Sequence, residues 1–173
     1  MLVAAVQYKD VLQSVGRSIW FNDKYKYWNA DTYWSTIDID DDTWNKHQFV
    51  SVCNGEIIGY IGYHIYRTAN RVAGLNIINF TDNIMVFGRD LHKALVDIFE
   101  LYEFNKLNFT VIVGNPIEKS YDKFIKKFGG RIIGIQKQHV RLVDNKLYDE
   151  KMYEICREDY LKSKNVQDEQ TTC

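Results

Sequence analysis

The sequence changes the period of its apolar residues at about residue 47, and this change limits the folds that the chain can adopt. Before it, Val11, Leu12 and Val15 recur at helical spacing, which predicts an amphipathic helix over residues 11–20. From His47 onward apolar and polar residues alternate, which predicts strands with one buried face. Helices followed by such strands indicate the α+β or mixed α/β class, because each sheet face needs a covering layer.

The first strands are separated by short turns. Asn54-Gly55 joins two alternating runs, residues 49–52 and 56–67, and Asn-Gly between such runs is the strongest short signal for a β-hairpin. A second turn at Asn70 leads into a third strand over 72–80, so we expect an antiparallel meander. The alternation places Ile57, Ile61, Tyr63 and Ile65 on one face of the second strand, and Tyr60, His64 and Tyr66 on the other.

A helix, a strand and a second helix are predicted next. Apolar residues at helical spacing predict a helix over 91–102, and the nearly continuous apolar run 107–113 predicts a central strand. For the second helix, Asn115 is a suitable N-cap and Pro116 suits the first helical position. Gly129-Gly130 is expected to end that helix.

The last predicted elements complete the fold class. Strands 132–142 and 147–156 are joined through Asp144-Asn145, a hairpin-type turn. Near the N-terminus, Asp31 is expected to cap a second short helix. The order is therefore two helices, three antiparallel strands, a helix–strand–helix segment and a hairpin. This order predicts an α+β (mixed α/β three-layer) fold with a central, mostly antiparallel sheet.

The composition indicates one folded domain. Of 173 residues only one is proline, and no Gly/Ser-rich linker divides the chain, so we expect a single domain over residues 1–161. Residues 162–173 are polar and aperiodic, which predicts a flexible tail. No segment approaches the roughly 20 apolar residues of a membrane span, and the N-terminus lacks the features of a signal peptide.

Charge and cysteine usage argue against several classes of function. The chain has 22 Lys and Arg against 23 Asp and Glu, whereas a dedicated nucleic-acid binder needs a basic excess. Cys53, Cys156 and Cys173 form no C-x-x-C pair, which indicates a reducing cytoplasm. The four histidines lack the spacing of metal ligands, so no metal site is expected.

Two segments in the C-terminal half carry a family resemblance. Residues 111–136 resemble the part of GNAT acetyltransferases in which a strand ends near an Asn, a helix ends in an aromatic residue and Gly, and a strand carries a second Gly. Residues 143–161 resemble the closing hairpin of the family, and are most similar to the branch that acetylates the N-termini of ribosomal proteins. The resemblance covers about 49–160. The matching residues are Asn115, Phe128-Gly129, Gly134, Asp149, Tyr153, Ile155, Arg157 and Tyr160.

The resemblance implies that acetyl-CoA is the cofactor. In the family a Q/R-x-x-G-x-G/A motif at a helix start holds the CoA pyrophosphate with backbone N–H groups. The corresponding residues are 85–90, where Gly88 matches and Asp90 replaces the last small residue. The Asp90 carboxylate would oppose the phosphates, with Arg89 partly compensating, or would cap the helix itself. The residues implied in cofactor binding are Phe80, Thr81, Met85, Val86, Phe87, Gly88, Arg89, Asp90, Leu91, Asn115 and Lys123.

The activity that the resemblance implies is transfer of an acetyl group from acetyl-CoA to a primary amine. The thioester would lie between two splayed strands, 72–81 and 107–113. Asp82, at the end of the first, is the candidate base, although its T-D-N context also suits a turn. Tyr121 is the candidate acid, one turn before the position of the family's Tyr, here Ile125, although Tyr121 also lies on an apolar stripe.

An aromatic N-terminal segment is the candidate acceptor site. The resemblance implies that the first two helices wall the acceptor pocket, where Tyr25, Trp28 and Trp34 would either stack on the acceptor or simply pack on the sheet. The acidic run 38–42 would either attract an amine or form a solvated loop. We expect a cytoplasmic, monomeric or homodimeric N-acetyltransferase whose acceptor is a small amine or a protein N-terminus. The alternative is a GNAT-fold domain without catalysis that serves as a binding or structural module.

Overall fold

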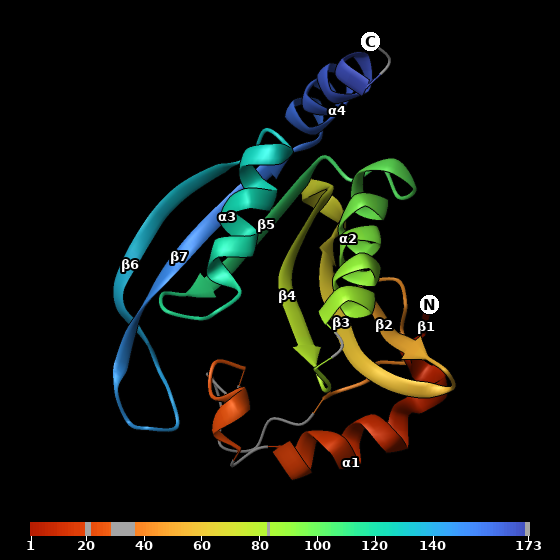
Figure 1. The fold of residues 1–173 in the computed structure, drawn as a ribbon, viewed down its shortest axis with the longest axis vertical. Helices are drawn as coiled ribbons and strands as arrows, with labels where there is room; N and C mark the ends of the chain where they lie inside the picture. The colour runs from red at the N-terminus through yellow and green to blue at the C-terminus, as the bar shows by residue number, and fades with distance from the viewer. Residues whose placement is uncertain (20–21, 29–36, 83, 172–173) are drawn as a thin grey trace.

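A computed structural model describes residues 1–19, 22–28, 37–82 and 84–171 of the chain. Within these residues seven strands form one sheet in the order β1-β2-β3-β4-β5-β7-β6 (Figure 1). Neighbouring strands are antiparallel except for β4 and β5, which are parallel. The strands are β1 (Leu2–Ala4), β2 (Lys46–Cys53), β3 (Glu56–Tyr66), β4 (Arg71–Asn79), β5 (Lys106–Ile112), β6 (Arg131–Arg141) and β7 (Leu147–Cys156).

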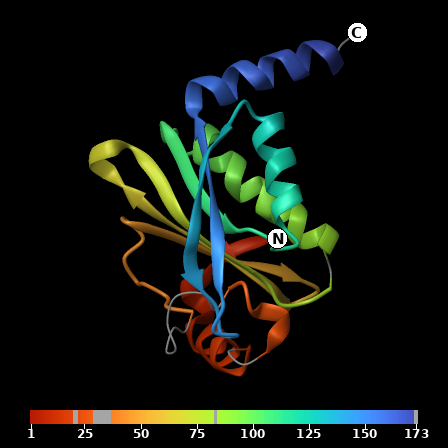
Figure 2. The same cartoon turned by 90° about the vertical axis from the view of Figure 1, so that its left-hand side faces the viewer.

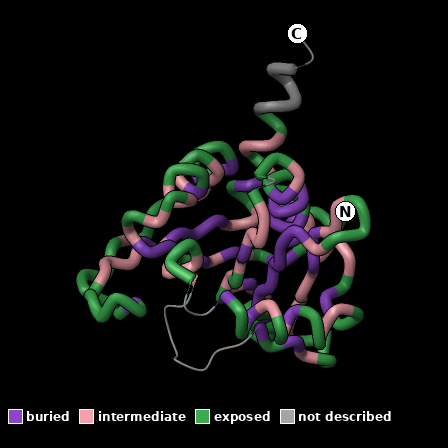
Figure 3. The backbone as a smooth tube through the Cα atoms, turned by 60° about the horizontal axis from the view of Figure 1, so that its bottom comes forward, coloured by how far each residue is buried: buried purple, intermediate pink, exposed green. Residues whose placement is uncertain are grey.

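Helices cover both faces of the sheet and produce three layers (Figures 1 and 2). On one face, α1 (Lys9–Ile19) packs against apolar residues of β2, β3 and β4. On the other face, α2 (Ile84–Glu100) and α3 (Glu118–Lys127) cover the larger core. Figure 3 shows that buried backbone gathers where the helices meet the sheet. This arrangement confirms the predicted α+β fold with a mostly antiparallel sheet.

The β2–β3 hairpin forms at Asn54-Gly55, as predicted. Both residues have positive φ angles, 52° and 83°, which a type I′ turn requires. The register shifts between Ser51 and Val52, because β3 contains one extra residue there. As a result Ile58 joins the core under α2, and Ile57 lies on the α1 side instead of the predicted face. A bulge of this kind reverses the side-chain alternation.

β4 and β5 lie side by side only at their first residues. Arg71 pairs with Lys106 and Val72 with Leu107, after which the two strands diverge (Figure 1). The outer edges of the two strands pair with β3 and β7. Beyond Val72, therefore, the edges that face each other have no strand partner within the described residues. The divergence confirms the predicted splay of these strands.

Two helix boundaries differ from the prediction. α2 begins at Ile84 rather than at residue 91, so residues 85–90 are helical. Ile84 and Met85 at the start of α2 are exposed, which hides the helical period of this turn in the sequence. α3 begins at Glu118. Asn115 shapes the preceding turn instead of capping the helix, since its Oδ1 accepts a 3.2 Å hydrogen bond from the Ile117 N–H.

The sequence does not predict the two terminal elements. Leu2–Ala4 forms β1 because it pairs with β2, more than 40 residues away. Residues 162–171, whose polar sequence predicts a flexible tail, continue α4 (Arg157–Thr171), which projects from the body in Figure 1. An i,i+4 ion pair between Lys162 and Glu158 supports the helix here. The helix predicted after Asp31 lies outside the described residues.

The described helices were compared with the dimensions of a bilayer. None of them combines the length and the apolar character that spanning a bilayer requires.

Candidate active site

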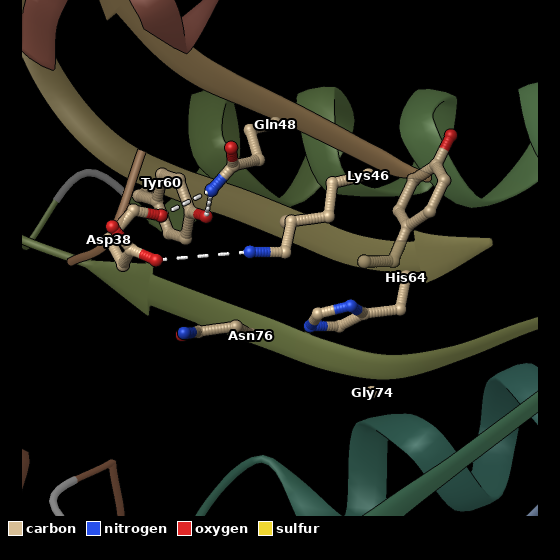
Figure 4. Close-up of a pocket in the computed structure, with 9 residues that line it drawn as sticks. Asp38, Lys46, Gln48, Tyr60, His64, Gly74 and Asn76 are labelled. Carbon is tan, nitrogen blue, oxygen red and sulfur yellow. Dashed lines mark hydrogen bonds and ion pairs between the residues drawn. The ribbon is translucent and has the colours of Figure 1, made fainter. Parts of the chain in front are cut away.

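A polar cavity of about 190 Å³, lined by Tyr60, lies on the face of the sheet that packs against α1 (Figure 4). Three adjacent strands supply most of its lining at alternating positions, because every second side chain of a strand points to the same face. β4 forms one wall, and the same strand forms one arm of the splay. The lining residues are Asp38, Lys46, Gln48, Tyr60, Gly62, Tyr63, His64, Gly74 and Asn76.

Two glycines make room for this cavity. A side chain at Gly62 would overlap the Tyr60 hydroxyl. Gly74 has φ +64°, and a Cβ there would lie 3.1 Å from Cδ2 of the His64 ring. The register of β3 and β4 shifts at this point, so Gly74 belongs to a bulge in β4 that only glycine adopts without strain.

A hydrogen-bond chain organises one end of the cavity. The Asp40 N–H donates to Oε1 of Gln48 at 2.8 Å, which orients the Gln48 amide. Nε2 of Gln48 then donates to the Asp38 carbonyl oxygen at 2.6 Å and to the Tyr60 hydroxyl at 2.7 Å. Burial raises the pKa of Tyr60 to about 12, so this hydroxyl keeps its proton at neutral pH.

Lys46 is the cationic group of the cavity. Its Nζ lies 3.2 Å from Oδ2 of Asp40 and 3.8 Å from Oδ2 of Asp38. A hydrogen bond from the Asp42 N–H lowers the pKa of the Asp40 carboxyl, and Lys46 lowers it further. Lys46 is thus balanced by two carboxylates, and the cavity as a whole is not basic.

His64 stands next to the Gly74 bulge and is the best-placed base. Partial burial lowers the pKa of His64, and the nearby charge of Lys46 lowers it further, while Asp40 acts in the opposite direction. The imidazole is therefore neutral at pH 7 and can accept a proton. Sequence reasoning placed His64 only on a strand face. The sequence contained one signal for this site. His64 alternates with Tyr60 and Gly62 along one strand, and the next strand contains a glycine.

The aromatic segment 22–28 lies across the open end of the splay. On one side, Nε1 of Trp28 donates a 2.6 Å hydrogen bond to Oδ1 of Asn76, a cavity residue on β4. On the other side, Lys26 Nζ donates to the Tyr148 hydroxyl at 3.2 Å, next to β7's start. The segment thus connects β4 to β7, the strand that pairs with β5.

The predicted acceptor residues differ in their relation to the cavity. Trp28 reaches it through Asn76. Tyr25 does not line it, and its hydroxyl donates to the Phe80 carbonyl oxygen at 3.2 Å. Trp34 lies outside the described residues.

The two predicted catalytic residues lie apart from the cavity. Asp82 follows β4 on the surface, where its side chain is 97% exposed and forms a 3.0 Å ion pair with Lys24. Tyr121 is buried, with its ring edge-on to Phe109 and Tyr153. Burial raises the pKa of Tyr121, and its hydroxyl has no hydrogen-bond partner within the described residues. Tyr121 therefore lies on the predicted apolar stripe of α3, with its phenol ring buried.

Asp90 does not face the predicted phosphate site. It lies in the second turn of α2, buried against β2, where its Oδ2 accepts 2.7 Å hydrogen bonds from the Met1 ammonium and the Ser51 hydroxyl. Burial opposes ionisation, but these two donors outweigh it and lower the pKa of the carboxyl. Asp90 therefore neither opposes a phosphate nor caps the helix, which corrects both predicted roles.

The remaining residues of the predicted cofactor set are divided between surface and core. Met85 and the side chain of Arg89 are exposed, and a Cβ on Gly88 would meet open space. Phe87 and Leu91 are buried in the core under α2. Phe80 packs near α1, and Val86 packs on the core under α2. Thr81 is hydrogen-bonded to Asn79, and Asn115 is hydrogen-bonded to Ile117. Lys123 is exposed on α3.

The start of α2 and the splay nevertheless suit a CoA-like ligand. The first turn of α2 carries no acidic side chain, so its backbone N–H groups and dipole favour an anion. The facing edges of β4 and β5 can hydrogen-bond amide groups in an extended arm, as strand addition does.

Comparison with known proteins supports the fold. No protein-family model and no curated protein matches the sequence. A solved structure of a probable acetyltransferase is similar with a TM-score of 0.57 at 16% identity, over 68% of this chain and 64% of that one. A spermidine/spermine N-acetyltransferase from Vibrio cholerae is similar with a TM-score of 0.56 at 18% identity, over 69% of this chain and 70% of that one. The match thus spans less than two thirds of the first of these chains.

These similarities, the splay and the β4 bulge define the architecture. The chain has the fold of the GNAT acetyltransferases.

Proposed function

We propose that the protein is an N-acetyltransferase that transfers an acetyl group from acetyl-CoA to a primary amine in the polar cavity. The observation that carries this proposal is the position of His64. It is a neutral imidazole beside the bulge of β4, the strand that the cavity shares with the splay. Structural neighbours with this fold are acetyltransferases, among them a spermidine/spermine N-acetyltransferase. They support an amine as acceptor.

The residues that would hold the cofactor belong to β4, β5 and α2. The unpaired edges of β4 and β5 would bind the pantetheine amides, and the first turn of α2 would bind the pyrophosphate. The Arg89 side chain is exposed, although its Nε lies 3.7 Å from Oδ1 of Asp90, and its guanidinium would bind a phosphate. When bound, acetyl-CoA supplies the activated acetyl group.

Proton transfer would use two side chains. His64 accepts the proton that the amine loses as its nitrogen forms the new amide bond. As the C–S bond of the thioester breaks, the hydroxyl of Tyr121 is the proposed proton donor to the leaving sulfur; it lies in the core under α2 and α3, not in the cavity. We assign the base to His64 rather than to Asp82, because the Asp82 carboxylate is solvated and paired with Lys24.

A binding titration tests this proposal. Acetyl-CoA at a hundred times its dissociation constant should stabilise the protein by about 2.7 kcal/mol, measured as a shift in thermal unfolding. If the unfolding temperature does not shift at millimolar acetyl-CoA, the proposed acetyltransferase activity is refuted. His64→Gln should keep the shift but lose most of the turnover. Gly88→Trp should abolish the shift, since an indole would fill open space beside the α2 N-terminus.

One observation favours a second function. Residues 85–90 are helical and match the family motif only at Gly88, as expected for a GNAT-fold module that binds or scaffolds without catalysis. The same titration separates the two functions, because such a module would not bind acetyl-CoA.

The finer assignments also stay proposals. They are the similarity to the ribosomal-protein branch, the cytoplasmic location, the monomeric or homodimeric state and the single domain over residues 1–161.

A further inference from the structure

The polar cavity contains hydrogen-bond donors that have no acceptor among the described residues. Tyr60 is 2% exposed and accepts from Gln48, so its own O–H proton has no acceptor within the described residues. An indole nitrogen only donates, so Trp28 must meet Oδ1 of Asn76. Among the residues that the structure describes, the Asn76 NH₂ group then has no acceptor. Lys46 meets two carboxylates and keeps a third N–H.

These donors belong together in space. They come from β2, β3 and β4 and line one hollow (Figure 4). Leaving a buried hydroxyl proton unpaired costs free energy unless water or a ligand accepts it. A single ligand oxygen with two lone pairs, such as a carbonyl oxygen, matches donors that converge in this way.

The charges around the hollow indicate the rest of the ligand. Asp38 and Asp40 both face Lys46, and His64 is neutral, so the balance is one negative charge. This balance favours a ligand with a net positive charge over an anion. The combination describes a cationic amine with a carbonyl oxygen close to it.

Resting on the proposed acetyl transfer, we propose that the acceptor is an amine whose neighbouring carbon carries a carbonyl group, as in a peptide N-terminus or an amino acid. Tyr60, Asn76 and Lys46 bind the carbonyl oxygen, and His64 faces the amine. Both sources of the ligand share this chemistry. The charge balance favours the peptide type, in which the carbonyl is uncharged.

Three small amines test the proposal. Glycinamide has the uncharged carbonyl, glycine has a carboxylate, and propargylamine has no oxygen although its ammonium is about as acidic as that of glycinamide. We expect kcat/KM for glycinamide or glycine to exceed that for propargylamine by about tenfold or more, as two or three hydrogen bonds provide. A higher kcat/KM for glycinamide than for glycine identifies a peptide N-terminus as the acceptor. A higher kcat/KM for glycine identifies a free amino acid. Equal or faster use of propargylamine overturns the proposal.

Two nearly isosteric variants test which side chains bind the carbonyl oxygen. Tyr60→Phe removes only the hydroxyl, and Asn76→Asp keeps an acceptor for Trp28 while removing the NH₂ donors. Each should lower the ratio of kcat/KM for glycinamide to kcat/KM for propargylamine by about three- to tenfold, because only glycinamide uses the lost donors. Tyr66→Phe, on the same strand but outside the cavity, is the matched control. An equal loss with both amines means a structural role and overturns the assignment.

Separate binding measurements distinguish this proposal from the proposed function. Acetyl-CoA and glycinamide are titrated individually into the protein by calorimetry. If acetyl-CoA fails to bind but glycinamide binds and Tyr60→Phe weakens it, the recognition stands and the acetyl transfer does not. If acetyl-CoA binds and is used with propargylamine while glycinamide is neither bound nor preferred, the recognition is wrong and the acetyl transfer stands.

Discussion

The indole N–H of Trp28 donates a 2.6 Å hydrogen bond to Oδ1 of Asn76, which joins the aromatic segment 22–28 to β4. On the opposite arm, the Tyr27 ring contacts Tyr148 edge-on at 6.3 Å between centroids. One short segment thus links β4 to β7, the neighbour of β5, and reaches the polar cavity through Asn76. This link makes Trp28 a positioning residue for Asn76.

Replacing Trp28 tests the link. Trp28→Phe keeps an aromatic ring but removes the donor, so it should destabilise the protein by about 1 kcal/mol. It should also lower kcat/KM for acetyl transfer several-fold, because Asn76 loses its fixed orientation. Chemical denaturation and steady-state kinetics measure the two effects. Trp44→Phe is the control, since Trp44 is exposed and stacks on Arg67 instead. An identical loss of activity in both variants would contradict the role of Trp28.

Replacing Gly74 in the β4 bulge should reduce stability and activity for two separate reasons. Gly74→Ala strains a residue with φ +64°, which costs about 1–2 kcal/mol, and it crowds the His64 ring at 3.1 Å. We expect a loss of stability and a larger loss of turnover. Gly55→Ala is a matched control, because Gly55 has φ +83° with nothing within 4 Å of an added Cβ. If Gly55→Ala reduced turnover as much as Gly74→Ala, the contact with His64 would not be responsible.

The pH dependence of activity should follow His64. Partial burial and then Lys46 lower its pKa, while Asp40 opposes them, so the active neutral form persists to below the ordinary value of 6.5. kcat/KM should therefore be full above that pH and fall as the pH drops through the lowered pKa. His64→Gln should remove this acidic limb together with most of the activity. Asp82→Asn should keep both, and loss of the limb in Asp82→Asn would make Asp82 the base.

Asp90 should contribute to stability and not to cofactor binding. Asp90→Ala leaves the fully buried Ser51 hydroxyl without its acceptor, which should cost about 1–3 kcal/mol in urea unfolding at pH 7. The folded pKa of Asp90 is lowered, so its stabilisation is present above the unfolded pKa of about 3.9 and is lost as the pH falls through the folded value. Asp90→Asn should flatten this acidic limb. Unchanged acetyl-CoA affinity in Asp90→Asn is expected, and a large change would return Asp90 to the cofactor site.

Local patterns were sufficient for much of the fold. The Asn54-Gly55 turn, the end of α3 just before Gly129 and the strands β2–β4 depend on backbone preferences and on a period of two, which neighbouring residues encode. The predicted splay of 72–81 and 107–113 came from the family resemblance. The actual start of α2 could not be predicted, because Ile84 and Met85 are exposed apolar residues that break the amphipathic pattern.

The site depended on contacts that no local pattern contains. Asp90 meets Met1 across 89 residues, and Trp28 meets Asn76 across 48. One-residue register shifts at Ile58 and Gly74 decide which side chains face α1 and which face α2. Period and turn chemistry therefore establish which strands and helices form. Only the packed structure decides which polar groups share one hollow, because a side chain's partner depends on how distant elements dock.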